Sequence, residues 1–157
     1  MDEKLALSTN EFAEIWRRVS DEPASVSGSS EESVLAALIE QSAKTAAYTA
    51  ALAKMFPSPG RTVLQTQAAE ERSRLRNLRA EYFLLTGESF APKSSCPGVS
   101  GKLASLRELY FMQQKLAVAF HAAAETAAPE RAEMYHQYAN EVECSAKESR
   151  RLLTECF

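Results

Sequence analysis

The chain has 157 residues, of which 45% are hydrophobic and 25% are charged, so it is long enough for one good core and short for two. Its net charge of −3 provides no basic surface for phosphate backbones, and nucleic acid is therefore not an expected partner. No apolar run is long enough to cross a bilayer, and the first residues contain early acids and no apolar segment of the secretory type. These properties predict a cytoplasmic protein with no membrane partner.

Residues 1–29 are predicted to form a leader helix followed by a flexible linker. Ser8 and Glu11 have capping-box spacing, and the apolar side chains of Phe12–Val19 then fall on one side of a short helix. Such a helix is too short to be stable alone, so it must dock. Docking within its own molecule or dimer is the favoured interpretation, and recruitment of a protein partner through Phe12–Val19 is the alternative. The Pro, Ser and Gly residues between positions 21 and 30 indicate the linker.

Residues 30–157 are predicted to fold as one all-α domain of four long helices. Ser29 and Glu32 form a second capping box, at the start of the first helix. Gly87 is placed to cap the end of the second helix, and Pro129 stands at a first-turn position of the fourth. The expected helices cover about residues 30–56, 61–86, 102–127 and 129–156.

The connections between these helices predict their arrangement. Two short connections make two antiparallel hairpins, and the long segment 88–101 joins them. Fourteen extended residues reach about 45 Å, whereas a helix of about 26 residues is roughly 39 Å long, so this segment can cross from one end of a bundle to the other. This is the ferritin-like arrangement of a four-helix bundle. An internal repeat supports it, with Gln41 and Tyr48 recurring as Gln113 and Phe120 at an offset of 72, and Ala68 and Glu70 recurring as Ala139 and Glu141 at 71.

Heptad seams along the four helices place polar residues at core positions. Glu71 lies in the seam of the second helix, and Arg74 follows it on the same side. Inward carboxylates in a Glu-x-x-His arrangement usually indicate a dinuclear metal site, but here the histidine position is arginine. The predicted seams of the first, third and fourth helices are Leu38, Gln41, Thr45, Tyr48, Leu52 and Met55; Leu103, Leu106, Tyr110, Gln113, Ala117, Phe120 and Ala124; and Tyr135, Tyr138, Val142, Ser145, Ser149 and Leu152.

From about Glu31 onward the chain resembles rubrerythrin-type members of the ferritin-like superfamily. The resemblance is strongest in AAEERSR and LRAEYFLLTGE of the second helix and in LRELYFMQQKLAVAFHAAAET of the third, and the leader NEFAEIWRRV is similar to segments of small bacterial proteins of this kind. It implies two irons held by one glutamate from each of helices one and three and by Glu-x-x-His from each of helices two and four. It also implies reduction of peroxide, oxidation by dioxygen or iron storage.

The implied ligand positions mostly lack ligands in this chain. The glutamates of helices one and three fall on Gln41 and Gln113, and Glu71 is retained while Arg74 replaces its histidine. An amide is a neutral, weak donor, and a guanidinium has no free lone pair for a metal. The seam places the last pair at Val142 and Ser145, and an alternative register would give Glu141 and Cys144.

We therefore expect a bundle with a degenerate diiron site and no cofactor. Arg74 would pair with Glu71 while the carbonyl oxygens of Gln41 and Gln113 accept its other N–H groups. The favoured function is a non-catalytic structural or interaction protein, expected to be a homodimer through an apolar helix face. The alternative is a rubrerythrin-like oxidoreductase that binds iron or manganese through a non-standard ligand set including Glu71 and Glu141.

The remaining metal-ligating side chains give weak signals. Cys96, Cys144 and Cys156 are odd in number and lack C-x-x-C spacing, so we expect free thiols and no zinc site. His121 and His136, the two histidines of the chain, both lie off the seams. For them a solvated position is favoured over metal ligation.

Overall fold

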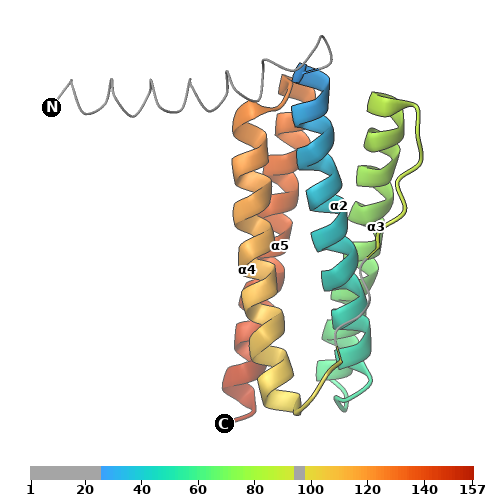
Figure 1. Ribbon diagram of the computed structural model, residues 1–157. Helices are drawn as coiled ribbons and strands as arrows, with labels where there is room; N and C mark the ends of the chain where they lie inside the picture. Colours follow the sequence, from blue (N-terminus) through green and yellow to red (C-terminus); the bar gives the residue numbers. More distant parts are fainter. Residues whose placement is uncertain (1–25, 94–97) are drawn as a thin grey trace, which may run out of the picture.

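The computed structural model describes residues 26–93 and 98–157, and all four helices predicted for the bundle are present (Figure 1). The predicted leader helix Phe12–Val19 and most of the linker lie outside the described residues. No strand occurs in the described ranges, so the fold is an all-α bundle. Its helices are α2 (Val26–Ala53), α3 (Gly60–Thr86), α4 (Lys102–Thr126) and α5 (Pro129–Glu155).

The helices form two antiparallel hairpins that pack side by side. Helices α2 and α3 make the first hairpin, and α4 and α5 make the second. Helix α2 also packs on α4, whereas α3 and α5 touch only lightly. Residues 88–93 run back from the end of α3 along the bundle, and α4 starts at the opposite end from the end of α3 (Figure 1). The predicted order of short, long and short connections is therefore confirmed.

Most helix ends agree with the sequence-based expectation, and the start of α2 differs from it. The helix begins at Val26 and includes Ser29, which the capping box placed just before the first turn. Once a helix has formed, each further residue that joins it gains one backbone hydrogen bond, so residues with weak helix propensity can extend it. At the end of α3, Gly87 adopts the left-handed conformation with φ 73° and donates its N–H to Phe83 O at 2.8 Å, as predicted.

The crossover segment is fastened to the first hairpin at three points. Arg79 Nε donates to Phe90 O at 3.1 Å, and the Phe90 ring lies 5.1 Å from that of Tyr82 between centroids. The Lys93 N–H donates to Glu40 Oε1 at 2.8 Å. These contacts hold the start of the crossover against both helices of the hairpin.

Two hydrophobic clusters fill the two halves of the bundle. One contains Leu38 of α2 and Leu78 of α3, and the other contains Leu52 of α2 and Leu109 of α4. Buried polar side chains occupy the level between them. The predicted α5 seam is buried throughout, whereas Leu103 of the predicted α4 seam is 38% exposed.

The two hairpins repeat the same burial pattern at an offset of 71 residues. Leu38 of α2 corresponds to Leu109 of α4, and Ala68 of α3 corresponds to Ala139 of α5. The offset of 72 predicted for α2 and α4 is therefore wrong by one residue. One residue turns a helix position by about 100°, which is enough to move a side chain from the core to the surface.

Gln41 shows the consequence of that error. The sequence placed Gln41 in the core as the counterpart of Gln113, but Gln41 is exposed. Its neighbour Ser42 is buried with 3% of its surface exposed, and it stands 71 residues before Gln113. The interior position on α2 is thus a serine.

None of the four described helices contains an apolar stretch of the length and composition needed to span a membrane.

Replacing Gly87 with alanine should destabilise the bundle by about 1 kcal/mol, because an L side chain is strained at positive φ. Urea denaturation followed by circular dichroism measures the change. Gly98→Ala is the matched control, because Gly98 has no positive φ and an added Cβ would meet nothing within 4 Å. Equal effects of the two substitutions would contradict a specific role of the Gly87 conformation.

Candidate functional site

A layer of buried polar side chains crosses the centre of the bundle. All four helices contribute to it, and we refer to it as the polar layer. It lies between the two hydrophobic clusters, and it contains the buried charged side chains of the bundle. The polar layer consists of Ser42, Thr45, Thr49, Gln67, Glu71, Arg74, Gln113, Ser145 and Ser149.

Two glutamines connect three helices through a chain of hydrogen bonds. Ser149 of α5 donates its hydroxyl to Gln113 Oε1 of α4 at 2.7 Å, and Gln113 Nε2 donates to Gln67 Oε1 of α3 at 2.8 Å. Gln67 Nε2 then donates to the backbone oxygen of Ser145 at 3.1 Å, which returns the chain to α5. Each amide thus donates one N–H and accepts one hydrogen bond at its oxygen, which limits the cost of burying it.

Glu71 is buried on the α2 side of the layer. Only 3% of its surface is exposed, and burial raises the pKa of its carboxyl to about 7. The Thr49 hydroxyl, the charge of Arg74 and the Gln113 amide lower the pKa again, but only in part. Burial therefore keeps the carboxyl protonated to a much higher pH than an exposed glutamate.

The hydrogen bonds around Thr49 accommodate both the charged and the protonated form of Glu71. Thr49 Oγ1 lies 2.8 Å from the backbone oxygen of Thr45 and 3.2 Å from Glu71 Oε1. A hydroxyl has one proton and cannot donate to both oxygens at once. If Glu71 is protonated, it can donate to Thr49, and Thr49 can donate to Thr45. The other oxygen, Oε2, has no hydrogen-bond partner among the described protein atoms.

Arg74 is buried but does not pair with Glu71 as predicted. It is 5% exposed, and Nη1 lies 3.8 Å from Oε2 of Glu141, whose side chain is 42% exposed. Its Nη2 has no partner among the described protein atoms. Glu71 turns toward Thr49 of α2 while Arg74 extends toward α5, so the two side chains diverge. The predicted contacts of Arg74 with Gln41 and Gln113 are also wrong.

On α5 the burial pattern follows the predicted seam and not the alternative register. Val142 and Ser145 are buried, at 1% and 4% exposed, whereas Cys144 is exposed. Glu141 lies at the edge of the interior and reaches Arg74 from there. Cys144 and Cys156 are free thiols, as expected, and the remaining cysteine lies outside the described residues.

The sequence interpretation overlooked Gln67 and Thr49. Gln67 precedes Glu71 by one helical turn, and Thr49 follows Thr45 by one turn, so a wider buried stripe with 3.6-residue periodicity would have included both. The narrow heptad seam omitted them, because it counts only two positions in seven.

The residues of the polar layer do not fit a pair of metal ions. Glu71 is the one carboxylate of the layer, and Arg74 adds a fixed positive charge beside it. Serine hydroxyls and glutamine amides are neutral and compensate little of the charge of two cations. Among the described residues, no group of three or more His, Cys, Asp or Glu side chains is arranged to hold a metal ion.

A groove between α3 and α5 leads from the surface to the polar layer. Its volume is about 520 Å³, and Gln67 and Ser145 are among the residues that line it. Glu70, Glu141 and Glu148 also line the groove, which makes its entrance acidic. The light contact between α3 and α5 leaves this space open.

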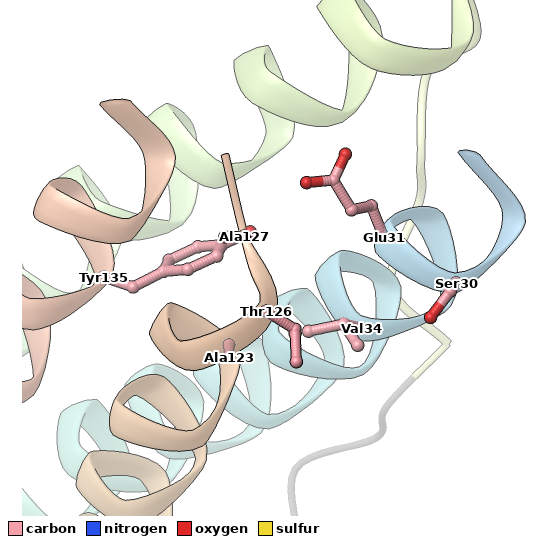
Figure 2. A pocket seen from close by; sticks show the side chains of 7 residues that line it. All are labelled: Ser30, Glu31, Val34, Ala123, Thr126, Ala127 and Tyr135. Atoms are coloured by element: carbon pink, nitrogen blue, oxygen red, sulfur yellow. The ribbon is translucent and has the colours of Figure 1, made fainter. Parts of the chain in front are cut away.

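A second, smaller pocket lies where α2 begins and α4 turns into α5 (Figure 2). Its volume is about 230 Å³, and Figure 2 shows the side chains of Glu31 and Tyr135 extending toward it from different helices. Glu31 Oε2 is already 3.1 Å from Arg131 Nη1, and its Oε1 accepts the Ala128 N–H at 3.3 Å. Burial raises the pKa of Tyr135 to about 12. The Tyr135 hydroxyl therefore does not titrate near neutral pH, and both oxygens of Glu31 already have partners.

Glu71→Gln should remove a dependence of stability on pH. Because the folded state binds the Glu71 proton up to about pH 7 and the unfolded state releases it near 4.5, the free energy of unfolding should fall as pH rises between these values. The expected loss is about 3 kcal/mol, and it levels off above the folded pKa. Urea denaturation of wild type and Glu71→Gln across this range measures the difference.

The exposed Glu133→Gln is the control for this comparison, and its pH profile should parallel that of the wild type. If the free energy of unfolding of Glu71→Gln changes with pH as that of the wild type does, the prediction is wrong, because the Glu71 carboxyl would then have the same pKa in the folded and unfolded states.

Gln113→Ala should destabilise the bundle by about 3 kcal/mol, because it leaves Gln67 and Ser149 without their partner and opens a cavity. Gln114→Ala provides the matched control, since Gln114 is exposed and bonds only the Tyr110 hydroxyl, at 2.7 Å. Its effect should stay within about 0.5 kcal/mol. Thermal denaturation of the two variants distinguishes a required hydrogen-bond chain from an incidental one.

No family model, curated protein or solved structure matches this chain. The resemblance in α3 and α4 therefore rests on the sequence motifs alone. Any function has to be inferred from the polar layer and from the arrangement of the helices around it.

Proposed function

We propose that this chain is a ferritin-like bundle that acts as a non-catalytic structural or interaction protein, and that its polar layer stands where related bundles hold two metal ions. The observation that carries the proposal is the buried guanidinium of Arg74 beside the single carboxylate Glu71. A fixed positive charge in the buried layer repels metal ions, and a guanidinium also supplies no lone pair to bind them.

The helix arrangement supports the ferritin-like part of the proposal. Two hairpins joined by one long crossover are characteristic of ferritin-like bundles. The common offset of 71 residues in burial relates the hairpins to each other. In that register Ser42 corresponds to Gln113, and Glu71 with Arg74 corresponds to Val142 with Ser145. These are the positions that would supply the six ligands of a dimetal site.

The polar layer supports the structural part of the proposal. The amide chain from Ser149 through Gln113 and Gln67 links both hairpins, and sliding either one by a turn would break it. When buried polar groups can form their hydrogen bonds in only one alignment of the helices, they favour that alignment over others, even where they add little stability. The layer would then serve to fix the register of the two hairpins.

The interaction part of the proposal rests on apolar side chains at the surface. Phe111 and Val118 of α4 are 42% and 68% exposed, seven residues apart on one face of the helix. A homodimer through this face remains our prediction. The predicted leader helix Phe12–Val19 is the alternative contact surface.

The first test measures metal content after incubation with ferrous iron and with manganese, beside a rubrerythrin-type control that loads fully. The chain is tested as wild type and with both histidines replaced by alanine, so that surface imidazoles cannot contribute. We expect no metal in the histidine-free variant. Close to two ions per chain would overturn the proposal and favour a diiron or dimanganese oxidoreductase.

The second test rebuilds the six ligands of a dimetal site at the core positions related by the offset of 71 residues. We expect the rebuilt variant to bind two metal ions, because Glu71 then has five new ligands around it. A matched variant that carries Gln41→Glu in place of the α2 substitution should bind less, since position 41 is exposed. A folded, metal-free rebuilt variant would contradict the correspondence. The substitutions are Ser42→Glu, Arg74→His, Gln113→Glu, Val142→Glu and Ser145→His.

A further inference from the structure

The two histidines of the chain meet on the surface of the second hairpin, away from the polar layer. His121 of α4 and His136 of α5 place their Nδ1 atoms 3.4 Å apart. Their ring centroids are 5.6 Å apart, and the ring planes are inclined by 50°. The sequence favoured solvated histidines, and both are accessible to solvent, but it gave no indication that they are neighbours.

Glu143 fixes the orientation of one of these rings. His121 Nε2 lies 2.9 Å from Glu143 Oε1, so Nε2 is the protonated nitrogen that donates to the carboxylate. In a neutral imidazole the other nitrogen then carries a lone pair. The lone pair of His121 Nδ1 is therefore directed to the side of the ring where His136 lies.

The separation of the two nitrogens suits a tetrahedral metal ion. Two imidazole nitrogens bound to zinc at about 2.0–2.1 Å with a tetrahedral angle are about 3.3–3.4 Å apart. The observed separation is 3.4 Å. A carboxylate on the far nitrogen is also the usual support of a zinc-bound histidine, because it sets the tautomer and the ring orientation.

We propose that His121 Nδ1 and His136 Nδ1 form a binding site for a divalent transition-metal ion of the zinc class, with Glu143 as the positioning residue of His121. The pair gives the ion two protein ligands, and water completes its coordination. This agrees with the finding that the described residues contain no group of three metal-ligating side chains around one point. The site is independent of the polar layer.

The ligand set and its exposure define which ions bind and how strongly. Imidazole nitrogen suits zinc, copper, nickel and cobalt, whereas magnesium and calcium require oxygen ligands. The His121 side chain is 40% exposed and that of Glu143 is 47% exposed, so the ion can enter without opening the bundle. With two ligands, we expect a dissociation constant in the micromolar range.

The test is a calorimetric titration of the full chain with zinc chloride. The three cysteines are replaced by serine in every protein so that thiols cannot bind the metal. We expect one zinc per chain, and His121→Ala and His136→Ala should each weaken binding at least about tenfold. Magnesium chloride, as the control ion, should give no binding. Absence of zinc binding, or binding that survives both histidine substitutions, would overturn the proposal.

Glu143 requires a separate readout because it does not touch the ion. Glu143→Ala should weaken zinc binding about tenfold and release the tautomer of His121, which nitrogen NMR of the two imidazoles detects directly. Glu143→Gln, whose amide oxygen still accepts a hydrogen bond, should restore part of the affinity. The exposed Glu133→Gln should change neither readout. If Glu143→Ala leaves both unchanged, the positioning role is wrong.

Discussion

The interior of this bundle is organised by the cost of burying side-chain amides, which lose their hydrogen bonds to water and need partners inside the protein. Gln67 and Gln113 meet this need by exchanging a hydrogen bond across the bundle and by using their remaining groups on Ser145 and Ser149. The bonds from Gln113 to Gln67 and from Gln67 to Ser145 join the two hairpins, so both are formed only when the hairpins are in register. The hydrophobic clusters above and below supply most of the driving force for association, since burial of apolar surface is not directional. In our proposal, the polar layer between them sets the alignment.

The charged members of the layer follow a different logic from the amides. Burial removes water from the Glu71 carboxylate and disfavours its charged form, which raises its pKa to about 7. Arg74 cannot give up its proton, so it turns toward Glu141 at the edge of the bundle. Glu71 and Arg74, three residues apart on one helix, therefore contact different partners, Thr49 and Glu141. The two side chains do not form a buried ion pair with each other.

The histidine pair shows that the chemical resources of a chain need not lie where a family resemblance directs attention. Of the six core positions at which metal ligands would be sought, Glu71 alone holds a carboxylate, and the others are Ser42, Arg74, Gln113, Val142 and Ser145. The two imidazoles of the chain instead meet on the outer side of α4 and α5, 15 residues apart in sequence and supported by Glu143. Our two proposals concern separate parts of the bundle, the polar layer in the interior and the histidine pair on the surface.

The sequence by itself determined the four helices, their antiparallel pairing and the burial of Glu71, Gln113, Val142 and Ser145. Apolar periodicity, proline and glycine punctuation and loop length are local properties, and each can be read along the chain. Tertiary structure decided which side of α2 faces inward, because a shift of one residue from Gln41 to Ser42 leaves the periodicity nearly unchanged. It also decided the partners of Arg74 and of the two histidines. Contacts between helices depend on helix rotation and crossing, and neither is written in the spacing of residues along a single helix.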